Sequence, residues 1–309
     1  MAAAEGRMII VVDGGGSTTA CAAFTGTHEH GRTELPSCKP AAGDTRTDEL
    51  CRYLGSWLVT THLNIASSDI LLVGMSGVWS QEERRSYTED LDLSWSRYVG
   101  DTVPRITVVS DIELVQLAAL NGRPGVVLVA GTGAIALGIA RDGRQIRVGG
   151  WGPRIDDAGS GFWMGRKALR AVAWMLDGRG PSTLLIRPVA AFLMADPADV
   201  PTLQNKLRTT SIDRCARLAH AVFAYAAEGD AVAMHIRGEA ARELARLITT
   251  VCSDTSDIPP DIVLYGSLWR DEPFYRIVHG LVSDQVHGAS LQTMTDVLAS
   301  TAEAMLTAS

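Results

Sequence analysis

The sequence has no excess of positive charge and no long hydrophobic run. It contains 28 Lys and Arg residues against 35 Asp and Glu residues, which gives a net charge of −7. No stretch gathers the basic residues that binding to a phosphate backbone requires, and no apolar run approaches the length of about 18 residues that crosses a bilayer. We therefore expect neither a nucleic acid nor a membrane as a partner.

Cysteine is scarce, and its spacing points to no site. The five cysteines are an odd number without a CxxC pair, so neither a disulfide framework nor a zinc site is indicated. The N-terminal segment lacks the basic and then long apolar regions of a signal peptide, because its apolar run at residues 8–12 leads directly into glycines. These features predict a cytoplasmic protein with reduced thiols.

Two common nucleotide-binding signatures are also missing. The chain has no GxxxxGK[ST] segment, and no GxGxxG follows a predicted strand. A Walker-type NTPase and a Rossmann dinucleotide site are therefore not supported. If the protein binds a phosphate group, it does so with another kind of loop.

Hydrophobic patterning predicts two α/β halves. At 309 residues, the chain is long enough for about two domains. In the first half, the pattern predicts strands at 8–12, 20–24, 70–74 and 106–110 and helices at 48–62, 81–97 and 113–120. The second half begins with strands at 125–131 and 134–140 and is then mainly helical, with helices that include 162–176 and 182–194, one strand at 262–265 and a last helix at 290–306.

A hairpin with a glycine-rich tip occurs once in each half. Glycines let a backbone adopt positive φ, turn tightly and approach a bound group closely, and clustered N–H groups and hydroxyls bind anions. Asp13 at the first tip could also orient a Mg²⁺ ion or its water. For each tip, a hairpin that binds nothing is the alternative. The candidate residues are Asp13, Gly14, Gly15, Gly16, Ser17 and Thr18 at the first tip and Gly131, Thr132 and Gly133 at the second.

Asp111 has two interpretations. It ends a buried strand, where α/β proteins place residues that face a ligand, and a carboxylate there could accept the proton of a substrate hydroxyl during phosphoryl transfer. It also precedes a predicted helix, where an N-cap carboxylate would accept hydrogen bonds from free N–H groups. The sequence leaves both roles open.

Five segments of the sequence form a combination that is more specific than any one of them. They are VVDGGGSTT at 11–19, SDIELVQLAAL at 110–120, VVLVAGTGAIALG at 126–138, VGGWGPRIDDAGSGFWMGRKALRAV at 148–172 and DGRGPSTLL at 177–185. This combination resembles the BadF/BadG/BcrA/BcrD-type ATPase family, and within it the N-acetylglucosamine and glucosamine kinases, over about residues 8–267. The resemblance implies an α/β fold of two ribonuclease-H-like lobes, as in actin and hexokinase, around an ATP cleft.

The resemblance also implies how the chain is divided and what it binds. The N-terminal lobe would comprise residues 1–112, joined by the C-terminal helix at about 290–309, and the C-terminal lobe residues 113–289. Asp111 would be the catalytic base, Asp13 would position Mg²⁺, and the protein would form a homodimer. The implied ATP contacts are the two glycine tips with Gly266 and Ser267, and the implied substrate contacts are Asp111, Gly150, Trp151 and Asp157.

Three departures from the family pattern bear on the ligands. Relatives read GDEGSG where this chain has DDAGSG, so Ala158 replaces a glutamate. Near residue 46, relatives carry an asparagine that binds the sugar, whereas Arg46 could bind a carboxylate or phosphate of the substrate; alternatively, Arg46 points to solvent and Asp44 pairs with it. The adenosine turn has also lost the first glycine of a Gly-Gly pair, before Gly266.

We therefore predict an ATP- and Mg²⁺-dependent kinase. Its small-molecule acceptor would be a hydroxyl group of an amino sugar or a sugar-derived metabolite, including an acidic sugar or a nucleoside. One alternative is an ATP-hydrolysing activator of a partner enzyme, although Cys215 and Cys252 lack the context of a cluster-binding pair. The other is a nucleotide sensor without catalysis, against which the joint presence of Asp13 and Asp111 argues.

Overall fold

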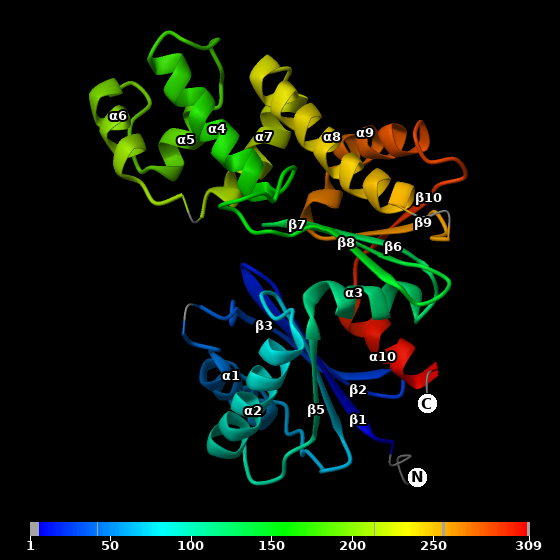
Figure 1. The fold of residues 1–309 in the computed structure, drawn as a ribbon. Coiled ribbons are helices and arrows are strands. Elements are labelled where there is room, and N and C mark those ends of the chain that lie inside the picture. The colour runs from blue at the N-terminus through cyan, green and yellow to red at the C-terminus, as the bar shows by residue number, and fades with distance from the viewer. Residues whose placement is uncertain (1–5, 42, 213, 255–256, 308–309) are drawn as a thin grey trace. The chain divides into compact units, whose positions relative to one another are not determined.

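The chain folds into two compact units. The computed structural model describes residues 6–41, 43–212, 214–254 and 257–307. One unit comprises Met1–Arg123 with Met294–Ser309, and the other comprises Pro124–Thr293. Each unit contains a mixed β-sheet with helices packed on it (Figure 1).

The first unit is built on a five-stranded sheet in the order β3-β2-β1-β4-β5. The central strand β1 pairs antiparallel with β2 and parallel with β4, which in turn pairs parallel with β5. Because β1 and β4 are parallel, the turn after β1 and the segment after β4 lie at the same edge of the sheet. The strands are β1 (Met8–Gly14), β2 (Thr18–Thr25), β3 (His28–Pro36), β4 (Ile70–Met75) and β5 (Arg105–Ser110).

Helices cover both faces of this sheet. Ile10 and Val12 of β1 belong to a core that includes Leu54 of α1 (Thr47–Thr60) and Leu91 of α2 (Gln81–Tyr98). On the other face, α3 (Asp111–Leu120) and α10 (Val297–Thr307) pack against each other and against β1. Because α3 packs in this way, the units divide after Arg123, whereas the sequence analysis expects a division after residue 112.

The sheet of the second unit repeats the strand order of the first. Its order is β10-β9-β6-β7-β8, and β6 pairs antiparallel with β7 and parallel with β9. Read from β8, this is the order of the first sheet, with a central strand between an antiparallel and a parallel neighbour. The repeated hairpin in the sequence therefore reflects a repeated sheet. The strands are β6 (Gly125–Ala130), β7 (Ala134–Ile139), β8 (Gln145–Gly149), β9 (Asp261–Tyr265) and β10 (Ser290–Met294).

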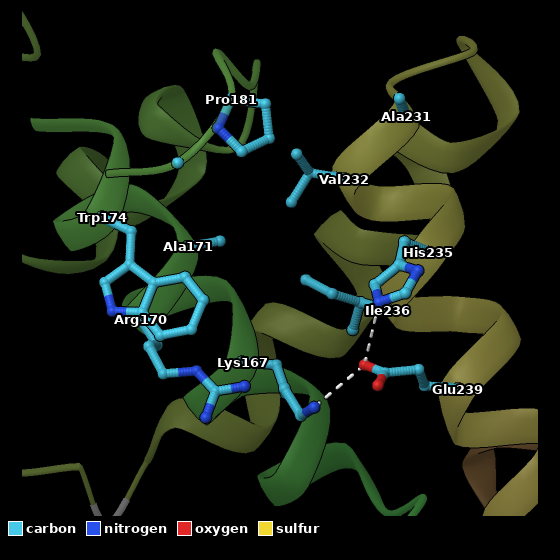
Figure 2. A pocket seen from close by; sticks show the side chains of 11 residues that line it. Lys167, Arg170, Ala171, Trp174, Pro181, Ala231, Val232, His235, Ile236 and Glu239 are labelled. Carbon is cyan, nitrogen blue, oxygen red and sulfur yellow. Dashed lines mark hydrogen bonds and ion pairs between the residues drawn. The ribbon is translucent and has the colours of Figure 1, made fainter. Parts of the chain in front are cut away.

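Helices form the rest of the second unit. The long α8 packs on β6, β7 and β8 and contacts α4, α7 and α9. Between α4 and the start of α8 lies a pocket (Figure 2). The helices are α4 (Gly161–Leu176), α5 (Ile186–Phe192), α6 (Val200–Thr209), α7 (Leu218–Ala227), α8 (Ala231–Asp254) and α9 (Glu272–Ser283), with short 3₁₀ turns at Cys215–Arg217 and Ser267–Arg270.

Three predictions of secondary structure need correction. The predicted helix at 290–306 is wrong over its first turn, because Ser290–Met294 forms the sheet-edge strand β10. The predicted helix at 182–194 begins only at Ile186, because the buried carboxylate of Asp230 accepts hydrogen bonds from the Thr183 hydroxyl and the Leu184 N–H and holds that segment as a loop. The edge strands β3 and β8 and helix α9 were not predicted.

Candidate active site

The turn between β1 and β2 is held by backbone contacts. The N–H of Ser76 donates to the carbonyl of Gly14 at 2.8 Å, and the N–H of Gly15 donates to the carbonyl of Thr18 at 2.9 Å. A Cβ atom on Gly14 would lie 2.4 Å from Met75 Sδ, so this position accepts only glycine without a shift. Gly16, Ser17 and Thr18 are exposed at the tip, and Asp13 is half-buried at the end of β1.

The glycines of the two tips do not use the positive φ that glycine allows. None of the five glycines at the two tips has a left-handed backbone. What requires glycine at the first tip is the close approach of β4 to Gly14. The tip is therefore a rigid feature of the sheet edge, with its terminal residues accessible to a ligand.

Asp111 is not the N-cap of α3. The N-cap is Ser110, whose hydroxyl accepts from the N–H of Glu113 at 3.4 Å, while the Glu113 carboxylate accepts from the Ser110 N–H at 2.9 Å. This reciprocal pair is a capping box, so Ser110 is the N-cap of α3. Asp111 is the first helical residue, and its Oδ1 accepts from the N–H of Ile112 at 2.9 Å. Asp111 therefore binds one N–H of the first turn but does not occupy the N-cap position.

The surroundings of Asp111 bring in two residues that the sequence analysis did not name. Burial raises the pKa of the Asp111 carboxyl, and hydrogen bonds from Ile112 and Ser76 and the positive charge of Lys39 offset part of this rise. Lys39 is exposed, and its Cε lies 3.4 Å from the place that a Cβ on Gly77 would occupy. Because Lys39 and Ser76 reach Asp111 from distant segments, no local sequence signal indicates them.

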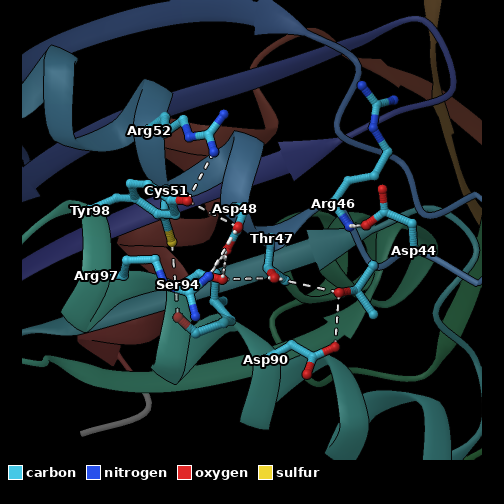
Figure 3. A network of polar contacts seen from close by, with 12 residues as sticks. Asp44, Arg46, Thr47, Asp48, Cys51, Arg52, Asp90, Ser94, Arg97 and Tyr98 are labelled. Carbon is cyan, nitrogen blue, oxygen red and sulfur yellow. Dashed lines mark hydrogen bonds and ion pairs between the residues drawn. The ribbon is translucent and has the colours of Figure 1, made fainter.

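Arg46 lies in the loop before α1, within a network of polar contacts (Figure 3). Its backbone N–H donates to Asp44 Oδ1 at 2.8 Å, and its guanidinium pairs with Glu49. Asp44 therefore contacts Arg46 through the backbone, while the guanidinium pairs with Glu49. Neighbouring hydrogen bonds join Thr45 to Asp90 at 2.9 Å and tie this loop to α2. Arg46 is thus held in place, with one carboxylate already balancing its charge.

In the second unit, the tip between β6 and β7 is held by the start of α4. The N–H of Gly161 donates to the carbonyl of Gly131 at 2.8 Å, and the N–H of Phe162 donates to the carbonyl of Thr132 at 3.1 Å. A Cβ atom on Gly133 would lie 2.9 Å from Asp157 Oδ2. The structure therefore brings the buried Asp157 against the second glycine tip.

Of the remaining predicted residues of this unit, Gly266 and Ser267 lie beside the second tip, and Gly150 and Trp151 follow β8. Gly266 lies beside the second tip, because a Cβ there would be 2.3 Å from the carbonyl oxygen of Ala130, and Ser267 Oγ is 4.0 Å from the Cβ position of Gly131. Gly150 has a φ of 69°, and its N–H donates to the carbonyl of Ala134 at 3.0 Å. Trp151 next to it is 70% exposed. Trp151 thus presents an open aromatic surface.

Ala158 stands where relatives carry a glutamate. Its side chain is half-buried and packs on the hydrophobic core of the second unit. Asp157 before it has a left-handed backbone, with a φ of 54°, and its carbonyl accepts from the N–H of Ser160 at 3.0 Å. This turn directs the Asp157 carboxylate to the second glycine tip and the Ala158 methyl to the core.

Among the described residues, no three His, Cys, Asp or Glu side chains gather as a set of metal ligands. None of the helices in the described part of the chain has both the length and the apolar character needed to span a membrane.

Comparison with known proteins identifies the family. Residues 11–302 match the BadF/BadG/BcrA/BcrD ATPase family. The chain belongs to this family. It is 30% identical over 246 residues to an N-acetylmuramic acid/N-acetylglucosamine kinase of Clostridium acetobutylicum, which covers 77% of each chain. It is also 32% identical over 184 residues to an N-acetyl-D-glucosamine kinase of Dictyostelium discoideum, covering 59% of this chain and 56% of that one.

Solved structures share the fold. The crystal structure of a proposed N-acetylglucosamine kinase from Chromobacterium violaceum superposes with a TM-score of 0.74 at 22% identity, over 97% of this chain and 99% of that chain. A ROK-family glucokinase from Streptomyces griseus, solved with glucose and AMPPNP, superposes with a TM-score of 0.59 at 15% identity, over 96% and 97% of the two chains. The predicted actin-like and hexokinase-like α/β fold is confirmed.

Family membership also settles the general class of activity. The predicted family is confirmed, and with it an ATP-dependent phosphotransferase with a hydroxyl acceptor.

Proposed function

We propose that this member of the family transfers the γ-phosphoryl group of ATP to a hydroxyl group of an amino sugar, with Asp111 as general base. The observation that carries the proposal is the environment of Asp111. It directly follows β5, Ser110 and not Asp111 is the N-cap of α3, and its half-buried carboxylate is desolvated. A desolvated carboxylate that is not the helix N-cap fits the role of a proton acceptor.

The contacts of Asp111 fit this chemistry. The Ile112 N–H and the Ser76 hydroxyl hold the carboxylate, which fixes its orientation before a substrate arrives. The positive charge of Lys39 favours the ionised form, and only the ionised form can accept a proton. The proton would move from the acceptor hydroxyl to the Asp111 carboxylate. The substrate oxygen would attack the γ-phosphorus as the bond from that phosphorus to the β,γ-bridging oxygen breaks, and ADP would leave.

The two glycine tips would bind the nucleotide. The first tip offers exposed backbone and the hydroxyls of Ser17 and Thr18, and the second lies beside Gly266 and Ser267. Asp13 is the carboxylate at the first tip, and one carboxylate suffices where Mg²⁺ keeps several waters and takes its other ligands from phosphates. Bound Mg²⁺ would neutralise charge on the phosphates. The residues present therefore fit a nucleotide-borne Mg²⁺ ion.

We also propose that the acceptor can carry an acidic group. The Clostridium relative is named for N-acetylmuramic acid, a sugar with a carboxylate, as well as for N-acetylglucosamine. Arg46 is held by its backbone bond to Asp44, and its guanidinium has donors beyond the pair with Glu49. Gly150, Trp151 and Asp157 are the proposed contacts to the sugar ring.

The experiment is an ADP-release assay with the wild type and Asp111→Asn. The acceptors are glucosamine, N-acetylglucosamine, N-acetylmuramic acid, neutral hexoses and a nucleoside. We expect turnover with the amino sugars and its loss in Asp111→Asn. Turnover in the variant equal to the wild type would overturn the role of Asp111. ADP release independent of every acceptor would instead support the ATP-hydrolysing activator.

A second variant tests the acidic acceptor. Arg46→Asn should lower kcat/KM for N-acetylmuramic acid by about tenfold, the value of one charge-assisted hydrogen bond, and change kcat/KM for N-acetylglucosamine much less. The matched control is Arg85→Asn on α2, because Arg85 also pairs with a carboxylate of its own helix, Glu89 at 2.8 Å. Equal effects of Arg46→Asn on both sugars would show that Arg46 does not select the acid.

A further inference from the structure

The pocket between α4 and α8 is lined by none of the residues assigned to the nucleotide and the sugar. Its volume is about 410 Å³, within the range of small-molecule sites. None of the glycine-tip residues, nor Gly150, Trp151, Asp157, Gly266 or Ser267, is among the residues that line it. The proposed kinase reaction therefore leaves this pocket without a role.

The walls of the pocket are fixed. The ion pair of Lys167 on α4 with Glu239 on α8, at 2.9 Å, joins the two helices (Figure 2). The loop at the rim is tied at both ends. At one end, the N–H groups of Arg179 and Gly180 donate to the carbonyl of Trp174 at 2.9 and 3.0 Å. At the other end, the Thr183 hydroxyl donates to the buried carboxylate of Asp230, which also accepts from the Ala233 N–H in the first turn of α8. A pocket with anchored walls needs little reorganisation to bind a ligand.

The lining combines a flat apolar surface with basic groups. Trp174 is 40% exposed, and Ala171, Val232 and Ile236 add aliphatic surface. The Arg170 guanidinium lies 4.8 Å from the centroid of the Trp174 ring. A cation stacked on an indole presents a flat surface with N–H donors at its edge.

One positive charge in this region is unbalanced. The charge of Lys167 is balanced by Glu239, and that of Arg179 on the rim by Asp177. Of the carboxylates that the structure describes, none pairs with Arg170. His235 already contacts Glu239 at 3.5 Å. The Arg170 guanidinium is therefore able to pair with an anionic group of a ligand in the pocket.

We propose that this pocket binds a small organic anion with a flat apolar body. Its carboxylate or phosphate group would pair with the Arg170 guanidinium, and its apolar body would lie against Trp174, Val232 and Ile236. A guanidinium binds either group through two parallel N–H donors, so the two anions share one recognition chemistry.

The test measures binding of three probes to the full chain by isothermal titration calorimetry. The probes share one flat body: 2-naphthoate, 2-naphthyl phosphate and the neutral 2-naphthamide. The variant is Arg170→Gln, and its control is Arg187→Gln on α5, an exposed arginine outside the pocket. Both substitutions lie on exposed side chains, and thermal denaturation verifies that each variant folds as the wild type does.

We expect at least one anionic probe to bind the wild type about tenfold or more tightly than the neutral probe. Arg170→Gln should remove this advantage, and Arg187→Gln should leave it unchanged. Tighter binding of the naphthoate or of the naphthyl phosphate identifies which anion the pocket prefers. Anion binding that persists in Arg170→Gln lies elsewhere, for example on the phosphate-binding tips. That result, or the absence of an anion preference, would overturn the proposal.

Discussion

Removing the cap of α3 should lower catalysis as well as stability. In Ser110→Ala, the helix loses the hydroxyl that accepts from the Glu113 N–H and donates to the Glu113 carboxylate at 2.7 Å. Asp111 is the next residue, so a frayed first turn displaces the proposed base directly. Stability and activity are therefore coupled through the first turn of α3.

The magnitude follows from the contacts. Loss of an N-cap serine costs about 0.5–2 kcal/mol, and the hydroxyl of Ser110 is fully buried and bonded to a charged group, which places the expected loss at about 1.5–3 kcal/mol. A displacement of a catalytic group by about 1 Å can cost on the order of a hundredfold in rate. For partial fraying, we expect a decrease in kcat of about tenfold.

Ser80→Ala is the matched control for this prediction. Ser80 caps α2 with the same reciprocal bonds, accepting from the Glu83 N–H at 3.1 Å while Glu83 accepts from its N–H at 2.7 Å. Ser80 is exposed, and no proposed catalytic residue follows it in the chain. The Ser80→Ala variant should therefore lose about 1 kcal/mol of stability and keep the wild-type activity. The assays are urea unfolding and steady-state kinetics. Wild-type kcat in Ser110→Ala, or an equal fall of kcat in Ser80→Ala, would refute the coupling.

Two further predictions concern Asp111 and Gly266. Because burial raises the pKa of Asp111 in the folded protein, its ionised form destabilises the fold; the penalty is present above the folded pKa and disappears below the ordinary value of about 3.9. Asp111→Asn should therefore raise Tm at pH 7, by an amount that shrinks as the pH is lowered toward 4, and an unchanged or lower Tm at pH 7 would contradict this. Gly266→Ala should lower the free energy of unfolding by about 1–3 kcal/mol because of the positive φ, and by about 1–3 kcal/mol more because the new Cβ clashes with Ala130. The control is Gly288→Ala, which has a φ of 73° and no atom near its Cβ and should show only the first loss. Both are measured by urea unfolding, and equal losses in the two variants would contradict the clash.

Most strands of the two sheets could be predicted from the sequence. Apolar runs predict β1, β2, β4, β6, β7 and β9, and also the edge strand β5. The other edge strands, β3, β8 and β10, consist mostly of exposed and half-buried residues, as in Ser290–Met294, where pairing with a neighbouring strand decides the conformation. Local patterning thus predicts apolar strands and fails for the polar strands at the sheet edges.

Two features of the first unit were present in the sequence but were not used. Ser110 and Glu113 have the S-x-x-E spacing of a capping box, which would have assigned the cap to Ser110 and not to Asp111. Arg46 and Glu49 are three residues apart, a spacing at which a side chain just before a helix pairs with one in its first turn. The contributions of Lys39 and Ser76 to the Asp111 site depend on tertiary structure, and so does the pocket beside Arg170.

The departure at Ala158 now has a structural explanation. A methyl group at this position completes the core of the second unit, while Asp157 keeps its carboxylate at the second glycine tip. The proposed sugar contact, Asp157, is therefore held at the second glycine tip with alanine at position 158.

The role of Asp111 as general base is tested most directly by comparing sugar phosphorylation and ATP binding in the wild type and Asp111→Asn. Product formation from N-acetylglucosamine and N-acetylmuramic acid is measured by mass spectrometry, and ATP affinity by calorimetry. A general base contributes about 10²–10⁴-fold, so the variant should lose that much kcat while its Kd for ATP stays within about twofold. Sugar phosphorylation at the wild-type rate in Asp111→Asn would show that Asp111 is not the general base.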